Sequence, residues 1–375
     1  MRKNIITGVS LVALSAGMAQ AGGFELQTLD TSIMYADGNQ VSVSYASIDA
    51  SVGGYNSAVG PTTKKAVVKD QTVSNFAGKF DVGDSLSVGL TTYRSGAIQL
   101  EGGNAADAGV NLAPTGDVDL DTSALMVRYS LNENISLIGG LTQNALKDGN
   151  VTTLAGSYNV SGKNDQGYVI GAAYSIPEIA LRAELTYQPK TTIQTTAAYT
   201  GAGNFLGFNN PSAATELALP DTYALSFQTG IAADTLLTAS YRKANWSKAQ
   251  ISVNVANVAP YSSANIGTAF SDSEAYSVGI GRKFTENLSG SITYSKEEGS
   301  SATSTSLFTV SNGSEAISIG VQYKRDNMTI SGGISQRTVG DVTVDPGLPA
   351  PLAGHTMIYS GNSVTAMGVK IAFAF

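Results

Sequence analysis

The stretch from Leu219 to Ser247 reads LPDTYALSFQTGIAADTLLTASYRKANWS, and its pattern predicts two strands joined by a tight turn. Every second residue of its first half is apolar, aromatic or threonine: Tyr223, Leu225, Phe227, Thr229 and Ile231. Alternation with a period of two gives a strand one apolar and one polar face. The connection at residues 232–234 is short enough for an antiparallel hairpin. The stretch therefore predicts a hairpin with one apolar face.

The same alternation recurs along the chain and at its end. It is present at Leu125, Val127 and Tyr129, at Ile179, Leu181, Ala183, Leu185 and Tyr187, and at Ile317, Ile319, Val321 and Tyr323. The last strand alternates Met367, Val369, Ile371, Phe373 and Phe375, so it ends on an aromatic residue. Such an ending resembles the signal that barrel-assembly machinery reads on outer-membrane proteins. We therefore expect that machinery to be a partner during biogenesis.

The connections between these segments alternate in length. Short turns lie at residues 81–84, 132–134, 176–178, 232–234, 285–287 and 325–327, and long connections rich in Gly, Ser, Asn and Pro lie at about residues 53–71, 101–118, 147–165, 196–215, 255–272, 299–313 and 344–362. Bacterial outer-membrane barrels sort their connections in this way, whereas a soluble sandwich has no reason to do so. The predicted fold is all-β: a 14-stranded antiparallel transmembrane β-barrel in the outer membrane of a Gram-negative bacterium, with both termini periplasmic.

The first residues, MRKNIITGVSLVALSAGMAQA, have the form of a secretory signal peptide. Arg2 and Lys3 precede an apolar run that closes with the small residues Ala19 and Ala21 around Gln20. That run is too short for a membrane helix, and no other segment reaches the roughly 18 to 20 apolar residues that one needs. The predicted organisation is a signal peptide at 1–21, a hatch at 22–39 and the barrel at 40–375.

Charge and cysteine content narrow the classes of function. The net charge of −7 becomes −9 once Arg2 and Lys3 leave with the signal peptide. An acidic chain argues against nucleic acid as a partner, because phosphate binding requires a basic face. The chain has no cysteine, although the signal peptide directs it to a compartment where disulfides form. A closed, hydrogen-bonded barrel supplies the stability instead.

The predicted mature N-terminus, GGFELQTLDTSIMYADGN, is apolar but has no partner strand of its own. Its apolar residues are Phe24, Leu26, Leu29, Ile33 and Met34. Such a segment needs burial, and the barrel lumen is the nearest place for it. The sequence therefore predicts a short hatch inside the lumen.

The fourth long loop carries Phe205, Leu206 and Phe208, where a solvated loop would have polar residues. Exposed aromatic residues on a surface loop could capture hydrophobic ligands, and they could equally pack as a loop core. The sequence leaves both readings open, with ligand capture as the functional one.

Three arginines, Arg128, Arg182 and Arg242, fall on the row opposite the apolar one, as does Glu184. They are expected to face the lumen. They either hydrate the interior and pair with one another, or hold an anionic headgroup in an apolar tunnel, since a carboxylate that leaves water requires a positive partner.

In the predicted strand that begins at Leu86, the row of alternating apolar residues is interrupted. After Leu86, Val88 and Leu90 the same face carries Arg94 and Gly96. A glycine inside a strand often marks a bulge, which breaks the pairing locally and opens the wall. The alternative is that Arg94 lies at the outer rim, where its side chain reaches water.

No catalytic or metal-binding pattern emerges. The single histidine, His355, lies in the Pro/Gly-rich stretch PGLPAPLAGHTM with no fixed partner. Asp117, Asp119 and Asp121 resemble the start of a calcium loop, but Thr122 replaces the glycine that such a loop needs. We expect no enzyme activity and no cofactor.

The chain resembles the FadL family of outer-membrane transporters for long-chain fatty acids and hydrophobic compounds. The resemblance rests on the Leu219–Ser247 stretch with its Asn245-Trp246-Ser247 ending, on the GGFEL start and on the closing GNSVTAMGVKIAFAF. It implies a 14-stranded barrel plugged by a hatch, with an inward kink in the third strand for lateral exit. Gly22 to Asn39 would be the hatch, and Ser95 to Ala97 would lie near the lateral opening with Arg94 and Gly96. The chain departs from the family in lacking an Asn-Pro-Ala motif before Gln40, so its hatch is shorter.

The sequence therefore predicts a passive uptake channel for hydrophobic molecules, such as long-chain fatty acids, that releases them through the barrel wall. We expect a monomer surrounded by outer-membrane lipids. Two rival functions remain. A general aqueous porin would have a polar, open pore, and a structural or adhesive surface barrel would transport nothing.

Overall fold

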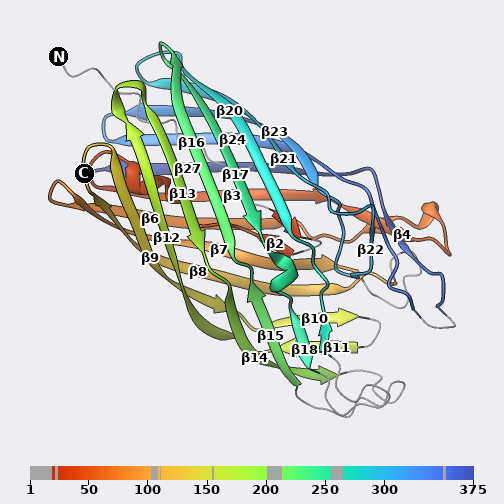
Figure 1. The fold of residues 1–375 in the computed structure, drawn as a ribbon. Helices are drawn as coiled ribbons and strands as arrows, with labels where there is room; N and C mark the ends of the chain where they lie inside the picture. The colour runs from red at the N-terminus through yellow and green to blue at the C-terminus, as the bar shows by residue number, and fades with distance from the viewer. Residues whose placement is uncertain are drawn as a thin grey trace.

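The computed structural model describes residues 19–21, 24–102, 109, 111–153, 156–200, 213–254, 265–348 and 352–375. Most of them form one large antiparallel sheet that closes on itself as a barrel (Figure 1). The closure is made by β27 and β3, whose ladder runs from Ser363 opposite Ser51 to Ala374 opposite Gln40. The predicted 14-stranded barrel is confirmed.

Several barrel strands are built from two segments separated by a short break. In chain order they are β3 (Gln40–Ser51), β6 (Gln71–Val82), β7 (Leu86–Glu101), β8 (Thr115–Ser130), β9 (Ile135–Leu146) with β10 (Gly149–Thr153), β11 (Gly156–Val160) with β12 (Lys163–Ile176), β13 (Leu181–Gln188) with β14 (Thr191–Thr200), β15 (Ala213–Leu219) with β16 (Thr222–Ala232), β17 (Thr235–Ala244) with β18 (Ser252–Asn254), β19 (Asn265–Gly267) with β20 (Ser273–Lys283), β21 (Leu288–Glu297), β23 (Ser314–Arg325), β24 (Met328–Val339) and β27 (Asn362–Ala374). The predicted short turns lie at one end, where the last strand finishes beside the first.

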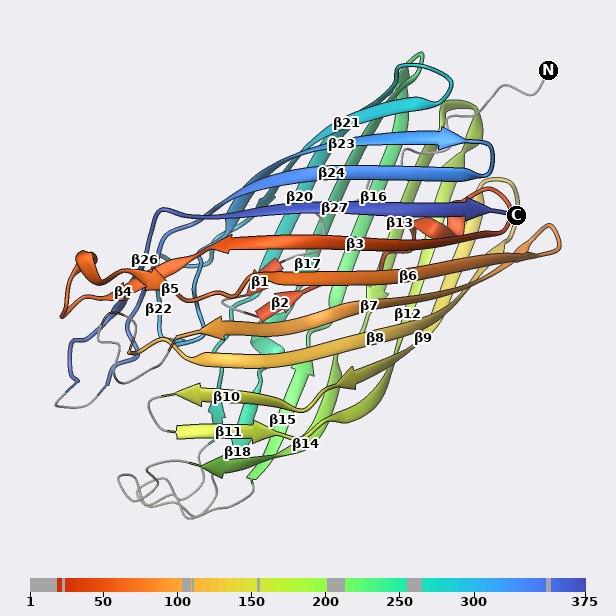
Figure 2. The same cartoon turned by 180° about the vertical axis from the view of Figure 1, so that it is seen from behind.

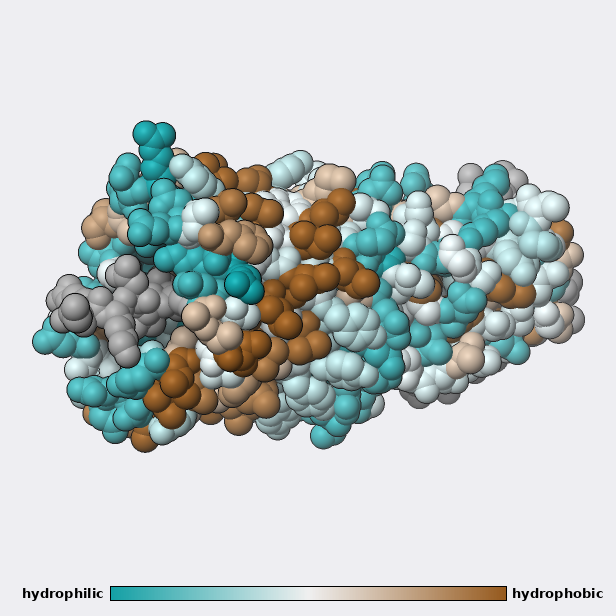
Figure 3. Space-filling model, turned by 90° about the horizontal axis from the view of Figure 1, so that it is seen from above, coloured by the Kyte–Doolittle hydropathy of each residue, from teal (hydrophilic) through white to brown (hydrophobic). Residues whose placement is uncertain are grey.

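Exposed apolar side chains lie on strands all around the short-turn half of the barrel and form an apolar band. Figure 3 shows the part of this band that lies on one face. Exposed aromatic residues border the band on both sides. Tyr45, Tyr168, Tyr223, Tyr241, Tyr276 and Tyr294 form the border nearer the loops, and Phe80, Tyr129, Tyr174, Phe284, Tyr323, Phe373 and Phe375 form the border at the short turns. Outer-membrane barrels place such aromatic girdles at the two membrane interfaces. We call the part within the girdles the membrane half and the part beyond the loop-side girdle the outer half.

In the broken strands β13–β14 and β15–β16, the set of alternate residues that faces outward changes between the two halves. Leu185 on β13 is 53% exposed, yet Ile193, an even number of residues further along, is 0% exposed on β14. Likewise Leu225 on β16 is 43% exposed and Leu217 on β15 only 2%. In an unbroken strand, residues separated by an even number share one face. The breaks at Pro189 and its neighbours therefore turn the strands over.

The reversal matches the change of solvent along the barrel. In the outer half the outward residues are polar, as at Asn159, Gln194 and Thr196, while the inward ones form an apolar core. That core includes Val160, Ile193, Leu217, Trp246, Phe270, Val344 and Tyr359. A second, five-stranded sheet contributes to it, made of β4 (Gly53–Asn56), β5 (Lys65–Ala66), β22 (Thr303–Ser304), β25 (Val342–Val344) and β26 (Met357–Tyr359).

The N-terminal segment lies inside the membrane half, as the sequence predicts. Its one-turn 3₁₀-helix, η1 (Ser32–Tyr35), packs Ile33 and Met34 against Ala124 and Met126 of β8. Leu29 packs against the same cluster. A Cβ at Gly89 of β7 would overlap the Met34 sulfur, so this glycine provides the space for the hatch.

The predicted long loops are partly strand. Residues 147–165 contain β10 and β11, and residues 344–362 contain β26. In the described part of the chain, no helix is long and apolar enough to span a membrane. Two short strands at the start, β1 (Ala19–Ala21) and β2 (Phe24–Leu26), pair with each other. β1 falls within the predicted signal peptide, whose cleavage stays a prediction.

Candidate functional site

The barrel wall has an interruption between β6 and β7. Phe76 pairs with Thr92, and Val68 pairs with Leu100 in the same register, eight residues further along each strand. Between these pairs no backbone pairing joins residues 70–75 to residues 93–98, all of which the structure describes. The pairing of two adjacent strands is thus lost and then regained, and we call this break in the hydrogen-bonded wall the window.

A bulge in β7 lies at this window. On the other side of β7, Arg94 pairs with Asp121 and Gly96 with Leu120, so Ser95 is an extra residue. Its side chain points away from the window, where its hydroxyl donates to Leu120 O (3.2 Å). A bulge bends a strand away from its neighbour. The extra residue is therefore a local cause of the lost pairing with β6.

The hatch segment occupies the edge of β7 that β6 has left. Leu26 of β2 pairs with Gly96, Glu25 pairs with Ala97, and Gln27 N donates to Ser95 O (3.0 Å). Figure 2 shows β2 between the ribbons of β6 and β7. Backbone N–H and C=O groups on an unpaired strand edge are costly to leave without hydrogen-bond partners, and β2 supplies partners for part of this edge of β7.

Arg94 connects the two sides of the window. Its Nη1 donates to Gln71 Oε1 of β6 (3.1 Å), and its Nε lies 3.4 Å from Asp119 Oδ1 of β8. Asp117, Asp119 and Asp121 face outward beside it and pair with Lys69, Arg94 and Lys147. The sequence analysis left two interpretations of Arg94: a place at a bulge that interrupts the pairing, or a place at the outer rim. These contacts agree with both, because the window itself lies at the outer rim of the membrane half.

Two of the three predicted lumen arginines meet the hatch. The guanidinium carbons of Arg182 and Arg128 lie 4.1 and 4.9 Å from the centre of the Tyr35 ring. Thr31 donates a hydrogen bond to Glu184, which is 4% exposed. The hatch is thus held by cation–π contacts and a buried carboxylate.

The other predicted site residues lie elsewhere. Arg242 is 7% exposed on β17 and interacts electrostatically with Glu297. Phe205, Leu206 and Phe208 lie outside the described residues. For Phe24 and Leu26 the structure describes the backbone only. The ligand-binding roles of all of these residues stay predictions.

His355 has no catalytic arrangement among the described residues. Its Nδ1 lies 3.2 Å from Asn56 Nδ2, and Asn56 also donates to Asn111 Oδ1 (2.7 Å). The sequence analysis missed Thr31 and Tyr35, which fasten the hatch. Thr31 is polar and Tyr35 does not continue the apolar spacing, so neither attracted attention in a search for apolar plug residues.

Solved structures of FadL-type channels share this architecture. A FadL homologue of Pseudomonas aeruginosa matches with a TM-score of 0.74 and 13% identity, covering 92% of each chain. The Ralstonia pickettii toluene transporter TbuX matches with a TM-score of 0.61 and 12% identity over 91% of this chain and 90% of that one. The Pseudomonas putida toluene transporter TodX matches with a TM-score of 0.62 and 10% identity over 92% and 91%.

Comparison with family models finds no match, and comparison with curated proteins finds none. The likeness is therefore one of three-dimensional structure at low sequence identity. It confirms the predicted FadL-type fold, including the closed 14-stranded barrel.

Proposed function

We propose that this barrel is a passive outer-membrane uptake channel for hydrophobic molecules, with release through the wall between β6 and β7. The observation that carries the proposal is the window at residues 70–75 and 93–98, where paired strands separate and rejoin. The structural relatives include transporters of toluene, a molecule that would gain nothing from a water-filled exit.

The interior beside this window is apolar. Inward residues of the outer half, such as Ile98 and Leu120, are 2% and 1% exposed, and both flank the bulge of β7. A hydrophobic molecule leaving water is stabilised by contact with such side chains. The apolar residues Phe205, Leu206 and Phe208 would capture it first, at the surface loop.

The cargo that we favour is a long-chain fatty acid. Its carboxylate needs a cationic partner inside the barrel, and Arg128, Arg182 and Arg242 are inward arginines that could supply one. If Arg182 or Arg128 binds the carboxylate, the carboxylate competes with the Tyr35 ring for that arginine. Binding of the fatty acid would then loosen the hatch. Arg182→Gln should then slow uptake of a fatty acid more than uptake of toluene.

Lateral release can be tested by closing the window. Ser74 and Arg94 occupy opposite register positions across it, and the chain has no cysteine of its own. Ser74→Cys with Arg94→Cys, joined by a short reversible methanethiosulfonate crosslinker, should stop uptake of labelled fatty acid by cells that lack another hydrophobic-compound channel. A reductant should restore uptake.

The matched control joins the same strands where they are already paired. Gly78 and Leu90 are direct partners on the outer face, so Gly78→Cys with Leu90→Cys should leave uptake unchanged after crosslinking. Equal uptake by both crosslinked variants would contradict release through the window. A large steady ionic conductance of the purified barrel would instead favour an aqueous porin.

A further inference from the structure

A polar recess lies on the outward face of the outer half, away from the window. It has a volume of about 550 Å³, within the range of about 300–1,000 Å³ that is usual for small-molecule sites. Gln194 of β14 pairs with Glu216 of β15, and Glu216 pairs with Ser252 of β18. Directly opposite residues of neighbouring strands share one face of the sheet. Since Gln194 faces outward, the recess is open to the medium around the barrel.

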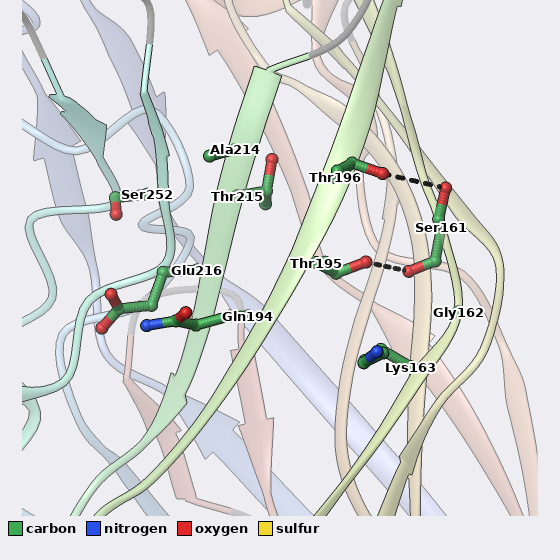
Figure 4. Close-up of a pocket in the computed structure, with 10 residues that line it drawn as sticks. All are labelled: Ser161, Gly162, Lys163, Gln194, Thr195, Thr196, Ala214, Thr215, Glu216 and Ser252. Atoms are coloured by element: carbon green, nitrogen blue, oxygen red, sulfur yellow. Dashed lines mark hydrogen bonds between the residues drawn. The ribbon is translucent and has the colours of Figure 1, made fainter.

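The lining of the recess is almost entirely polar. Apart from Gly162 and Ala214, each of the residues that line it carries a hydroxyl, an amide or a charged group. Figure 4 shows the Gln194 amide beside the Glu216 carboxylate on one side of the recess and the Lys163 side chain on the other. One cation and one anion leave the lining close to neutral. Such a lining suits a ligand with many hydroxyl groups better than a hydrocarbon or a simple ion.

Several of these polar groups are available to a ligand. Within the described part of the chain, no hydrogen bond or ion pair engages the side chains of Lys163, Gln194 and Ser252. Glu216 Oε1 lies 3.8 Å from Lys190 Nζ, a long contact for an ion pair. A carboxylate accepts several hydrogen bonds, and an amide both donates and accepts. The adjacent Gln194 and Glu216 side chains can therefore bind neighbouring hydroxyls of one sugar ring.

The pairing of the wall is interrupted beside the recess. No backbone pairing joins residues 162–169 to residues 188–195, all of which the structure describes. In an antiparallel sheet, alternate residues of a strand direct their N–H and C=O groups to the same side. Alternate backbone groups at the start of β12 and within β14 therefore face this break without a partner strand. Hydroxyl groups of a sugar both donate and accept, so they can hydrogen-bond such groups.

The height of the recess above the membrane narrows the choice of ligand. On the unbroken β12, Lys163 lies five residues from Tyr168 of the loop-side girdle, toward the loops. At about 3.3 Å per residue and a strand tilt of about 40°, Lys163 lies about 13 Å above that girdle. The headgroup layer of a phospholipid leaflet is only about 5–8 Å thick. A headgroup of several sugars reaches the recess, whereas a phospholipid headgroup does not.

The wall below the recess is apolar. Ile170 of β12 and Leu185 of β13 are 51% and 53% exposed on the outward face of the membrane half. Tyr187 and Tyr223 lie at the girdle above them, with ring centres 4.7 Å apart. Aromatic residues at this level border the lipid headgroups. A molecule with its headgroup in the recess would thus place its acyl chains against lipid-facing side chains.

We propose that the recess binds the oligosaccharide headgroup of a glycolipid embedded in the outer leaflet of the membrane. Gln194 and Glu216 hydrogen-bond hydroxyls of one sugar, and Lys163 donates to a hydroxyl on the opposite side. The acyl chains lie along the outward face of β12 and β13. The site is separate from the lumen and from the window, so it does not depend on the proposed uptake function.

Two variants at the recess test the proposal. Ala214→Trp adds a bulky side chain to the lining at an exposed position of β15. Gln194→Ala removes the amide from an exposed position of β14. The matched control is Ala302→Trp, because Ala302 is an exposed alanine before β22 in the outer half and does not line the recess. The mobility shift on heating checks that every variant forms a closed barrel.

The probes are rough lipopolysaccharide, which carries several core sugars, and lipid A, which has the same kind of acyl chains and lacks those sugars. Native mass spectrometry of the purified barrel in detergent gives the dissociation constant for each. The unmodified protein should bind rough lipopolysaccharide roughly tenfold more tightly than lipid A, as two net hydrogen bonds would give. Ala214→Trp should abolish this difference and Gln194→Ala should reduce it, whereas Ala302→Trp should retain it.

Three outcomes would overturn the proposal. Equal affinity of the unmodified protein for the two lipids would show that the recess does not bind the sugars. A preference that survives both Ala214→Trp and Gln194→Ala would place the saccharide elsewhere on the protein. The free core oligosaccharide should bind at least roughly tenfold more weakly than the intact lipopolysaccharide, because it lacks the acyl chains. Equal binding of the two would mean that the ligand is not a membrane lipid.

Discussion

The membrane half and the outer half are built from the same strands but have opposite polarity. On β16, within the membrane half, Leu225 faces outward and is 43% exposed, whereas Leu217 on β15 faces inward and is 2% exposed. The two segments belong to one barrel strand with a single register to its neighbour. The difference shows that the solvent outside the wall, lipid or water, decides which face is apolar.

In β13–β14 and β15–β16 this change coincides with a break, whereas β8 makes it unbroken, with Leu125 outward in the membrane half and Asp117 outward in the outer half. Pro189 and Pro220 lie side by side at the break, where Gln188 pairs with Thr222 and Thr191 with Leu219. Proline cannot donate to the ladder, so it is tolerated where pairing is interrupted. Because both strands break at the same level, they turn over together and keep their register.

The largest expected effect is on the outer-half core. Trp246 is 0% exposed and meets Phe270 edge to face at 5.4 Å between ring centres. Trp246→Ala should lower the free energy of unfolding by about 3–5 kcal/mol, because the cavity cannot collapse fully. Urea unfolding in lipid vesicles measures the change. Val59→Ala, at a residue 43% exposed in the same half, should change it by less than about 0.5 kcal/mol.

A charge placed on each outer face tests the polarity directly. Ile280, 45% exposed, lies midway between Tyr276 and Phe284 of the two girdles. Ile280→Arg should cost about 2–4 kcal/mol, the expected cost of arginine at the membrane midplane. Gln194→Arg, on the outer face of the outer half, should cost less than about 0.5 kcal/mol. Similar losses in vesicle unfolding would place lipid against both halves.

The sequence was sufficient for the strand count but not for the outer half. Alternation at Leu181, Leu185 and Tyr187 with a short turn predicts a membrane strand because apolar residues must face lipid. Beyond Pro189 the phase reverses, so a search for outward apolar residues reads the segment as a loop. The strands within residues 147–165 were missed for this reason, since their apolar residues Tyr158 and Val160 face inward.

The hatch contacts should give an intermediate effect. Tyr35→Ala removes the ring that faces Arg128 and Arg182, so we expect hatch docking to weaken by about 1–2 kcal/mol. Ionic current through single barrels in planar bilayers should then show more frequent openings. Tyr35→Phe keeps the ring and should change the current less. If Tyr35→Phe raises the frequency of openings as much as Tyr35→Ala, the hydroxyl rather than the ring holds the hatch. If neither variant changes it, Tyr35 does not hold the hatch.

The candidate site was only partly predictable for a related reason. Gly96 and Arg94 interrupt an apolar row, which is a local signal, so the bulge could be anticipated from neighbouring residues. The contact between Tyr35 and Arg182 joins the hatch to β13 across the lumen. No local pattern encodes it, because it depends on how the closed barrel brings distant strands around the hatch.

The smallest effect is expected for an ion pair on the outer face of the outer half. Lys147 Nζ lies 2.6 Å from Asp121 Oδ2, with side chains 54% and 43% exposed. Water screens such a pair, so despite the short distance Asp121→Asn should lower the free energy of unfolding by less than about 0.5 kcal/mol, and 1 M salt should abolish the difference. The same pair facing lipid would be screened far less. A loss that is larger and independent of salt in vesicle unfolding would mean that lipid reaches Asp121, and the boundary between the halves would have to move toward the loops.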